Sequence, residues 1–176
     1  MVRKSLTLRL SSGNISVYSD EDTDGKMEDK KMYRMTQYRV SLVKDSAEMK
    51  EGTRRIDSVQ AIAEACADMK ALDREQLRVY YINARMGLIG WELISQGTLT
   101  ASLAHPREIF KGAILATCHG IILAHNHPSG EPSPSEEDVR LTKRVAQCGQ
   151  ILGIRVLDHV IIAENGTYSF KASGQL

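Results

Sequence analysis

The sequence contains little of several residue types, and each scarcity argues against a class of protein. Aromatic residues make up only 5% of the 176 residues, which disfavours a surface that binds nucleic acid by base stacking. No apolar stretch is long enough to cross a bilayer, and the N-terminus lacks the continuous apolar region of a signal peptide. The net charge of +1 creates no strong field that would attract nucleic acid or a membrane surface. We therefore expect, by default, a cytoplasmic protein with no membrane partner.

Cysteine is also scarce. The three cysteines, Cys66, Cys118 and Cys148, form no C-x-x-C pair, and their odd number does not favour a disulfide framework. We expect them to be small buried apolar residues in a reducing compartment.

The remaining composition is typical of a globular domain, with 42% hydrophobic and 26% charged residues. The length fits one domain with a tail. Residues 20–31 are highly charged and nearly free of apolar side chains, so they cannot bury enough surface to fold alone. We expect residues 1–50 to form an N-terminal extension, partly disordered, that can hold one strand near residues 37–44. Residues 51–176 then form the folded domain.

Hydrophobic periodicity predicts the elements of that domain. Helices are expected at residues 57–72, 106–117 and 135–152, and strands at residues 77–84, 88–95, 98–103, 120–124, 154–163 and 167–170. Residues 120–124 (GIILA) are apolar throughout, as expected of a central strand that is buried on both faces. This mixture predicts an α/β or α+β sandwich, in which two or three helices cover one sheet.

The segment after this central strand carries the strongest functional signal. His125 and His127 are two residues apart at the end of the strand, so both rings lie on one face. Asp138 follows in the first turn of the next helix, which can bring its carboxylate opposite the imidazoles. Two imidazoles and one carboxylate can hold zinc and leave a position open for water, which is the usual arrangement for metal-assisted hydrolysis. The sequence thus predicts one Zn²⁺ per chain, although it does not exclude another divalent ion.

Each part of this motif also has a simpler interpretation. Ser135 and Asp138 match the spacing of a helix-capping arrangement, and an H-x-H pair is common by chance. An apolar strand before the histidines and a capped helix after them favour the metal site over these interpretations.

Hydrolysis at such a site needs a group that manages protons. A glutamate near the open coordination position can accept a proton from water and later donate it to a leaving amine. Glu75, Glu92 and Glu108 all flank predicted elements, and the residues alone do not choose among them.

The stretch HNHPSGEPSPSEED, followed by VRLT, resembles the RadC family of bacterial JAB/MPN domains, which carry the JAMM metal motif. Shorter segments are similar to the same family: Glu75–Leu77, Gly97–Leu99, His105–Glu108, Asp158–Ile162 and Ser169–Phe170. The resemblance covers about residues 55–176. It implies a JAB1/MPN cytidine-deaminase-like sandwich with a mixed central sheet flanked by helices.

The resemblance also implies a role for each motif residue. His125, His127 and Asp138 match the zinc ligands, and Ser135 matches a serine that helps to stabilise an oxyanion. Glu75 lies where the family has its general base, just before the first core strand. These residues imply a zinc metalloprotease of the JAMM/MPN+ type. A metal-activated water would attack the peptide or isopeptide carbonyl of an unidentified protein or peptide substrate.

Two alternatives stay open, namely a non-catalytic MPN scaffold and a factor associated with DNA repair or a mobile element. Arg140, Lys143 and Arg144 form a short basic face, but three such charges more often serve solubility than phosphate binding. Longer RadC proteins carry an N-terminal helix-hairpin-helix region, a binder of the DNA backbone, and residues 1–54 contain no convincing counterpart. We therefore expect a short form that does not bind nucleic acid directly. The oligomeric state stays open.

Overall fold

The computed structural model describes residues 6–11, 14–19, 40–43, 54–97 and 104–176. The chain divides into two units, Met1–Ser41 and Leu42–Leu176. No helix of the described residues combines the length and the apolar character needed to span a membrane.

The first unit contains an antiparallel hairpin that the sequence analysis did not anticipate. Its strands are β1 (Leu6–Ser11) and β2 (Asn14–Ser19), and Leu6 pairs with Ser19. Leucine alternates with polar residues along β1, which is a strand pattern too short to stand out beside the charged segment that follows. Of the strand expected near residues 37–44, only residues 40–43 are described, and they belong to no strand. Residues 20–31 lie outside the described residues.

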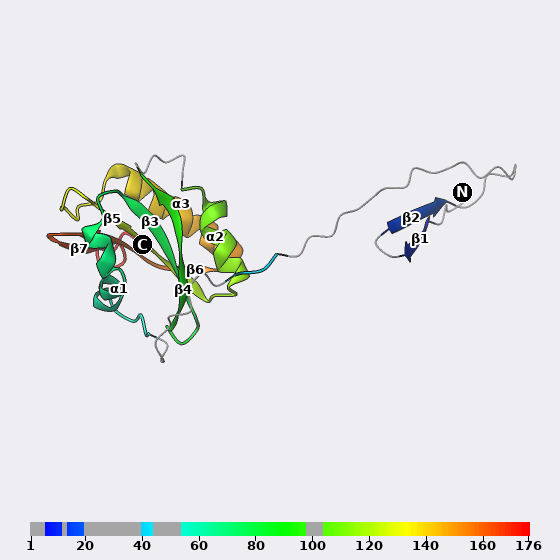
Figure 1. Ribbon diagram of the computed structural model, residues 1–176, viewed down its shortest axis with the longest axis horizontal. Coiled ribbons are helices and arrows are strands. Elements are labelled where there is room, and N and C mark those ends of the chain that lie inside the picture. The colour runs from blue at the N-terminus through cyan, green and yellow to red at the C-terminus, as the bar shows by residue number, and fades with distance from the viewer. Residues whose placement is uncertain (1–5, 12–13, 20–39, 44–53, 98–103) are drawn as a thin grey trace, which may run out of the picture. The chain divides into compact units, whose positions relative to one another are not determined.

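The second unit is built on one five-stranded sheet in the order β4-β3-β5-β6-β7 (Figure 1). The strands are β3 (Gln76–Ile82), β4 (Leu88–Gln96), β5 (Gly120–Asn126), β6 (Arg155–Ala163) and β7 (Gly166–Ser169). β5 and β6 run parallel, and the other neighbouring pairs are antiparallel. The strand expected at residues 98–103 lies outside the described residues.

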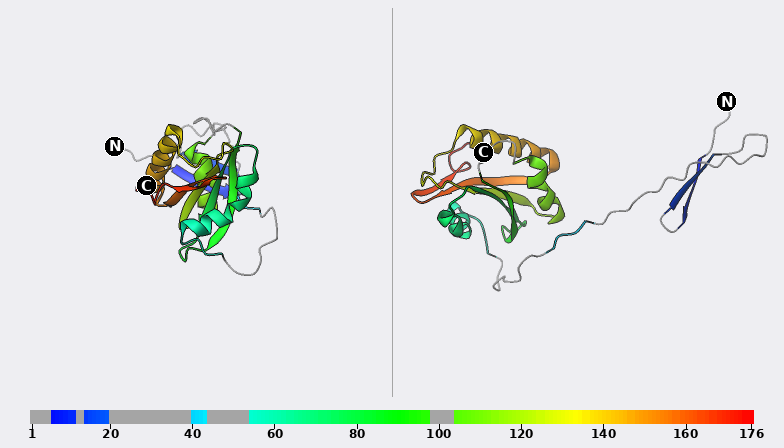
Figure 2. Two further views of the ribbon diagram at one scale, coloured as in Figure 1. Left: turned by 90° about the vertical axis from the view of Figure 1, so that its left-hand side faces the viewer. Right: turned by 45° about the horizontal axis from the view of Figure 1, so that its top comes forward.

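Helices cover both faces of this sheet (Figure 2, right). One face packs against α1 (Val59–Ala65) and the 3₁₀ helix η1 (Ala67–Ala71), and the other against α2 (Pro106–Leu115) and α3 (Glu136–Leu152). Each face has its own cluster of buried apolar side chains. The expected sandwich with a mixed sheet flanked by helices is therefore confirmed.

Local signals explain where the helices begin and end. Ser58 caps α1 through a hydrogen bond from the Ala61 amide, and the single helix expected at residues 57–72 divides at Cys66 into α1 and η1. Pro106 occupies the first turn of α2, where its missing amide hydrogen has no cost. Gly153, with φ of 69°, ends α3 in the left-handed conformation that favours glycine.

β5 places His125 and Asn126 at the end of the sheet, directly before His127. All its residues are buried, and their side chains alternate between the two faces. Ile121 and Leu123 belong to the cluster under α2 and α3, whereas Ile122 and Ala124 belong to the cluster over α1. By the same alternation, His125 faces α3.

Candidate metal centre

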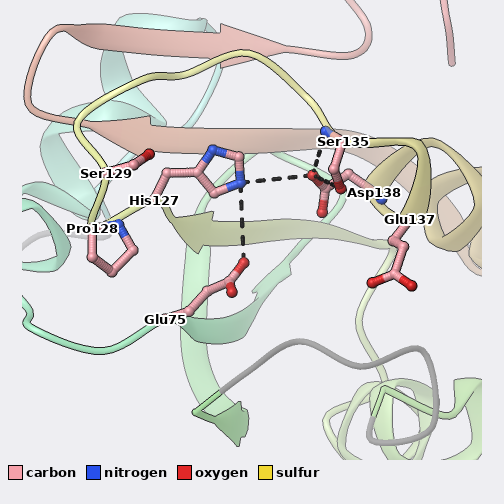
Figure 3. A pocket seen from close by; sticks show the side chains of 7 residues that line it. All are labelled: Glu75, His127, Pro128, Ser129, Ser135, Glu137 and Asp138. Atoms are coloured by element: carbon pink, nitrogen blue, oxygen red, sulfur yellow. Dashed lines mark hydrogen bonds and ion pairs between the residues drawn. The ribbon is translucent and has the colours of Figure 1, made fainter.

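Three side chains converge at the carboxyl end of β5. The Nε2 atoms of His125 and His127 lie 3.1 Å apart. Asp138, in the first turn of α3, has Oδ1 at 3.2 Å from His125 Nε2 and Oδ2 at 3.6 Å from His127 Nε2. Figure 3 shows the carboxylate of Asp138 facing the His127 ring. The three residues predicted as ligands thus meet at one point.

These separations fit a tetrahedral metal ion. With bonds of 2.0–2.1 Å to nitrogen or oxygen, two ligand atoms of tetrahedral zinc lie about 3.3–3.4 Å apart. The three measured separations, from 3.1 to 3.6 Å, bracket that value. Three such ligands leave the fourth tetrahedral position for another group.

Glu75 is a second acidic side chain close to the two histidines. Its Oε1 lies 4.0 Å from His127 Nε2, and it forms with the two histidines a second group that could hold a metal. We favour Asp138 as the third ligand because its oxygens are closer to the tetrahedral spacing and contact both imidazoles. Glu75 and Asp138 both face Nε2 of His127, so Glu75 can act on a group bound beside that atom (Figure 3).

Asn126 fixes the backbone on both sides of Glu75. Its Oδ1 accepts a hydrogen bond from the Gln76 amide at 2.8 Å, and its Nδ2 donates to the Arg74 carbonyl at 3.1 Å. The Glu75 carbonyl accepts a further bond from the Gly97 amide. Asn126 is buried, and its side chain points to the face of β5 opposite to that of His125. The residue between the two histidines therefore positions Glu75, a role that the sequence analysis missed.

His127 is oriented by the loop that follows it. Its Nδ1 donates to the Glu131 carbonyl at 2.8 Å, because a carbonyl can only accept. The hydrogen on Nδ1 leaves the lone pair of the neutral ring on Nε2, which faces Asp138. The loop turns at Gly130, whose φ of 84° is left-handed.

Ser135 and Asp138 form a capping box at the start of α3. The sequence analysis gave this capping as an alternative to a role in metal binding. The Ser135 hydroxyl donates to Asp138 Oδ2 at 2.6 Å and also accepts from the Asp138 amide. The same Oδ2 accepts from the Ser135 amide at 2.8 Å. The cap fixes the carboxylate at the start of α3, so the capping and ligand interpretations are compatible. The hydroxyl hydrogen of Ser135 is thereby directed to Asp138.

The local electrostatics keep this carboxylate ionised. Burial raises the pKa of Asp138, but the adjacent imidazoles of His125 and His127 and the hydrogen bond from Ser135 together hold it far below its usual value. The adjacent carboxylate of Asp138 raises the pKa of His127, and burial only partly offsets that increase. A carboxylate that stays charged beside two imidazoles is a suitable ligand set for a divalent cation.

A third histidine lies directly behind His125. His159 of β6 is fully buried, and its Nε2 lies 2.9 Å from His125 Nδ1. Burial, together with the nearby His125, lowers the pKa of His159 well below its usual value. From the sequence, His159 was expected only to belong to a segment similar to the family and to make a local hydrogen bond with Asp158. Its one signal was an ionisable pair, Asp158-His159, inside an otherwise apolar strand.

The convergent side chains open into a cleft of about 330 Å³. Figure 3 shows the side chains that line it: Glu75, His127, Pro128, Ser129, Ser135, Glu137 and Asp138. A cleft at the end of a central strand, lined by ionisable groups, is typical of a catalytic or binding site.

The other glutamates considered as a base lie elsewhere. Glu92 accepts a hydrogen bond from the Tyr81 hydroxyl, and Glu108 is exposed and paired with Arg107 and Lys111. Neither lines the cleft. Of the basic face on α3, Arg140 is paired with two acidic residues of its own helix.

Comparison with known proteins identifies the family of this chain. A family model described as "RadC-like JAB domain" matches residues 56–175. A UPF0758 protein of Symbiobacterium thermophilum is 48% identical over 126 residues, which cover 70% of this chain and 54% of that protein. A second, from Desulfitobacterium hafniense, is 50% identical over 122 residues (69% and 54%), and one from Thermotoga maritima is 41% identical over 122 residues (69% and 55%). The chain spans about half the length of these relatives, whose names state no activity.

Proposed function

The chain belongs to the family of RadC-like JAB domains, and from this premise we propose that it is a zinc-dependent peptidase that cleaves a peptide or isopeptide bond. One observation carries the proposal. Two imidazole nitrogens and one carboxylate lie at tetrahedral spacing, beside a cleft lined by a further glutamate. Three protein ligands and one open position are typical of catalytic zinc, whereas structural zinc is normally closed by four.

In this proposal His125, His127 and Asp138 hold the ion. Zinc, when bound, lowers the pKa of water toward neutrality and polarises a carbonyl oxygen. Hydrolysis then consumes one water and one amide bond, and yields a carboxylate and an amine.

Glu75 is the proposed general base. Its carboxylate, 4.0 Å from His127 Nε2, takes a proton from the attacking water and later gives it to the leaving nitrogen. Asn126 binds the backbone on both sides of Glu75, and the Gly97 amide donates to the Glu75 carbonyl. These bonds support the role, because proton transfer needs a fixed geometry.

Ser135 is the proposed stabiliser of the oxyanion. Its hydroxyl lines the cleft and would turn from Asp138 toward the substrate oxygen as negative charge develops there. The substrate is proposed to be a protein or peptide, as the family resemblance implies, and the cleft has room for a short part of an extended chain.

The substitution Glu75→Gln tests this account directly. It removes the base but none of the three proposed ligands, so the variant should bind zinc as the wild type does. Its rate of hydrolysis should fall by about 10²–10⁴-fold, the usual contribution of general acid–base catalysis. The assay is a digest of a peptide library by the zinc-loaded protein, in which mass spectrometry identifies new termini.

Glu108→Gln is the matched control, because Glu108 is an exposed carboxylate outside the cleft. It should leave hydrolysis unchanged. A Glu75→Gln variant that cleaves as fast as the wild type would remove Glu75 from this role. A wild type that binds zinc but cleaves nothing in the library would favour the alternative of a non-catalytic scaffold.

A further inference from the structure

A chain of buried hydrogen bonds runs behind the proposed metal ligands. It passes from His125 Nδ1 to His159 Nε2 at 2.9 Å, and from His159 Nδ1 to the Thr142 hydroxyl at 2.6 Å. The Thr142 hydroxyl then contacts the backbone carbonyl of Asp138 at 2.6 Å. All four residues are buried, and the chain joins β5, β6 and α3.

The hydrogens in this chain can be assigned from one end. The Asp138 carbonyl can only accept, so the Thr142 hydroxyl donates its one hydrogen there. Thr142 must then accept from His159, which puts the His159 hydrogen on Nδ1 and the lone pair on Nε2. His159 Nε2 in turn accepts from His125 Nδ1–H, and the lone pair of His125 is left on Nε2. This order satisfies each contact from the Asp138 carbonyl to His125 Nδ1, and it leaves on His125 Nε2 the lone pair that a metal ligand needs.

The surroundings hold the His159 ring in place. Phe170 stacks on it with ring centroids 4.9 Å apart and an angle of 8° between the planes. Asp158 accepts hydrogen bonds from the Ser169 hydroxyl and from the backbone amides of His159 and Lys171. These bonds tie the turn that carries Phe170 to β6. The ring therefore has little freedom to rotate away from His125.

We propose that His159 and Thr142 are positioning residues of the metal centre, an inference that rests on the proposed metal site. They fix the tautomer of His125 and direct its Nε2 toward Asp138. Asp138 takes part at both ends, with its carboxylate beside His125 Nε2 and its carbonyl bonded to Thr142. We call the four residues His125, His159, Thr142 and Asp138 the relay. The relay fixes the positions of the two proposed ligands His125 and Asp138 relative to each other. His159 is not itself a ligand, because its Nε2 faces His125 Nδ1.

The substitution Thr142→Val tests the relay. Valine keeps the branched shape of threonine but removes the acceptor of the His159 Nδ1 hydrogen, which leaves a buried donor without a partner. Zinc affinity, measured by competition with a chromogenic chelator, should fall by about 10–100-fold, as is usual when an outer partner of a metal ligand is lost. Thr142→Ser keeps the hydroxyl and should restore most of the affinity. An equal loss in both variants, or no loss in Thr142→Val, would overturn the proposal.

The position of the His159 hydrogen gives a readout that a merely structural role would not move. In the ¹⁵N-labelled, zinc-loaded wild type, long-range ¹⁵N–¹H spectra should show His159 neutral, with its hydrogen on Nδ1. A hydrogen on Nε2 would overturn the relay while leaving the zinc site intact. A wild type that binds no zinc would refute the metal site and the relay together, so the two failures are distinguishable.

Discussion

Five of the eight buried polar residues of the described chain lie around the carboxyl end of β5. His125, Asn126, Asp138, Thr142 and His159 are all buried, and each has a hydrogen-bond partner within the group or on the adjoining backbone. A buried polar group without a partner costs roughly 2–7 kcal/mol, and apolar residues would fill the same space with less risk. Polar residues concentrated at this one place are therefore better explained by chemistry than by stability.

Cys66, in contrast to these residues, is buried but takes no part in the site. It is fully buried under α1, and burial raises the pKa of its thiol to about 11. The thiolate is the reactive form, so at pH 8 only about one thiol in a thousand would be ionised. The ionised fraction rises about tenfold for each pH unit up to the pKa.

We therefore predict that Cys66 resists a thiol reagent in the folded protein. Labelling with 5,5′-dithiobis(2-nitrobenzoate) at pH 8, with mass spectrometry of the peptides, should leave Cys66 unmodified and should label it only after denaturation. The half-buried Cys148 serves as the internal control. Labelling of Cys66 at the rate of Cys148 would show that this side of the core opens readily.

At the scale of elements, the sequence predicts most of the second unit. The apolar run at residues 120–124 became β5, and the capped segment at residues 135–152 became α3, because each signal is local and strong. The division at Cys66 was not predicted, because the apolar spacing continues through it. The hairpin of β1 and β2 was missed because its pattern is short.

In the proposed metal site, too, only the features that depend on local sequence could be predicted. The proposed ligand set is recognisable because the spacing of His125, His127 and Asp138 is local in sequence. Glu75 needed a family resemblance, because the residues alone did not separate it from Glu92 and Glu108. Asn126 and the relay through His159 and Thr142 could not be predicted from sequence, since they depend on pairing between β3, β5 and β6 and on the docking of α3.

The packing of α3 on β6 depends on Gly149. A Cβ atom at this position would lie 2.6 Å from the Ile154 carbonyl oxygen and 3.0 Å from Val156 Cγ2. The backbone oxygen cannot turn away as a flexible side chain would, so α3 must shift if any side chain is added.

We predict that Gly149→Ala lowers the free energy of unfolding by about 1–3 kcal/mol, the usual cost of overpacking, even though alanine favours helices. Gly90→Ala in β4 is the matched control, because a Cβ there meets no atom within 4 Å. That variant should stay within about 0.5 kcal/mol of the wild type. Urea denaturation measures both. An unchanged or higher stability of Gly149→Ala would show that α3 does not dock as closely as described.

At the scale of the whole molecule, the site joins segments that are far apart in sequence. Glu75 precedes β3, and the two histidines lie at the end of β5 and just after it. Asp138 and Thr142 lie in the first two turns of α3, and His159 lies in β6. Each comes from, or directly flanks, an element packed on the shared sheet (Figure 1). The mixed sheet therefore acts as the scaffold that brings the proposed ligands, the proposed base and the relay together at the carboxyl end of its central strand, β5.

The central claim is that the carboxyl end of β5 holds a metal ion, and the metal content of the purified protein tests this claim most directly. Elemental analysis after dialysis should find about one zinc per chain in the wild type, as three preorganised ligands imply. His127→Ala should lose that zinc, because it removes a ligand that is only partly buried. His119→Ala, which removes an exposed histidine outside the cleft, should keep it. A wild type without metal, or a His127→Ala variant with as much zinc as the wild type, would contradict the account.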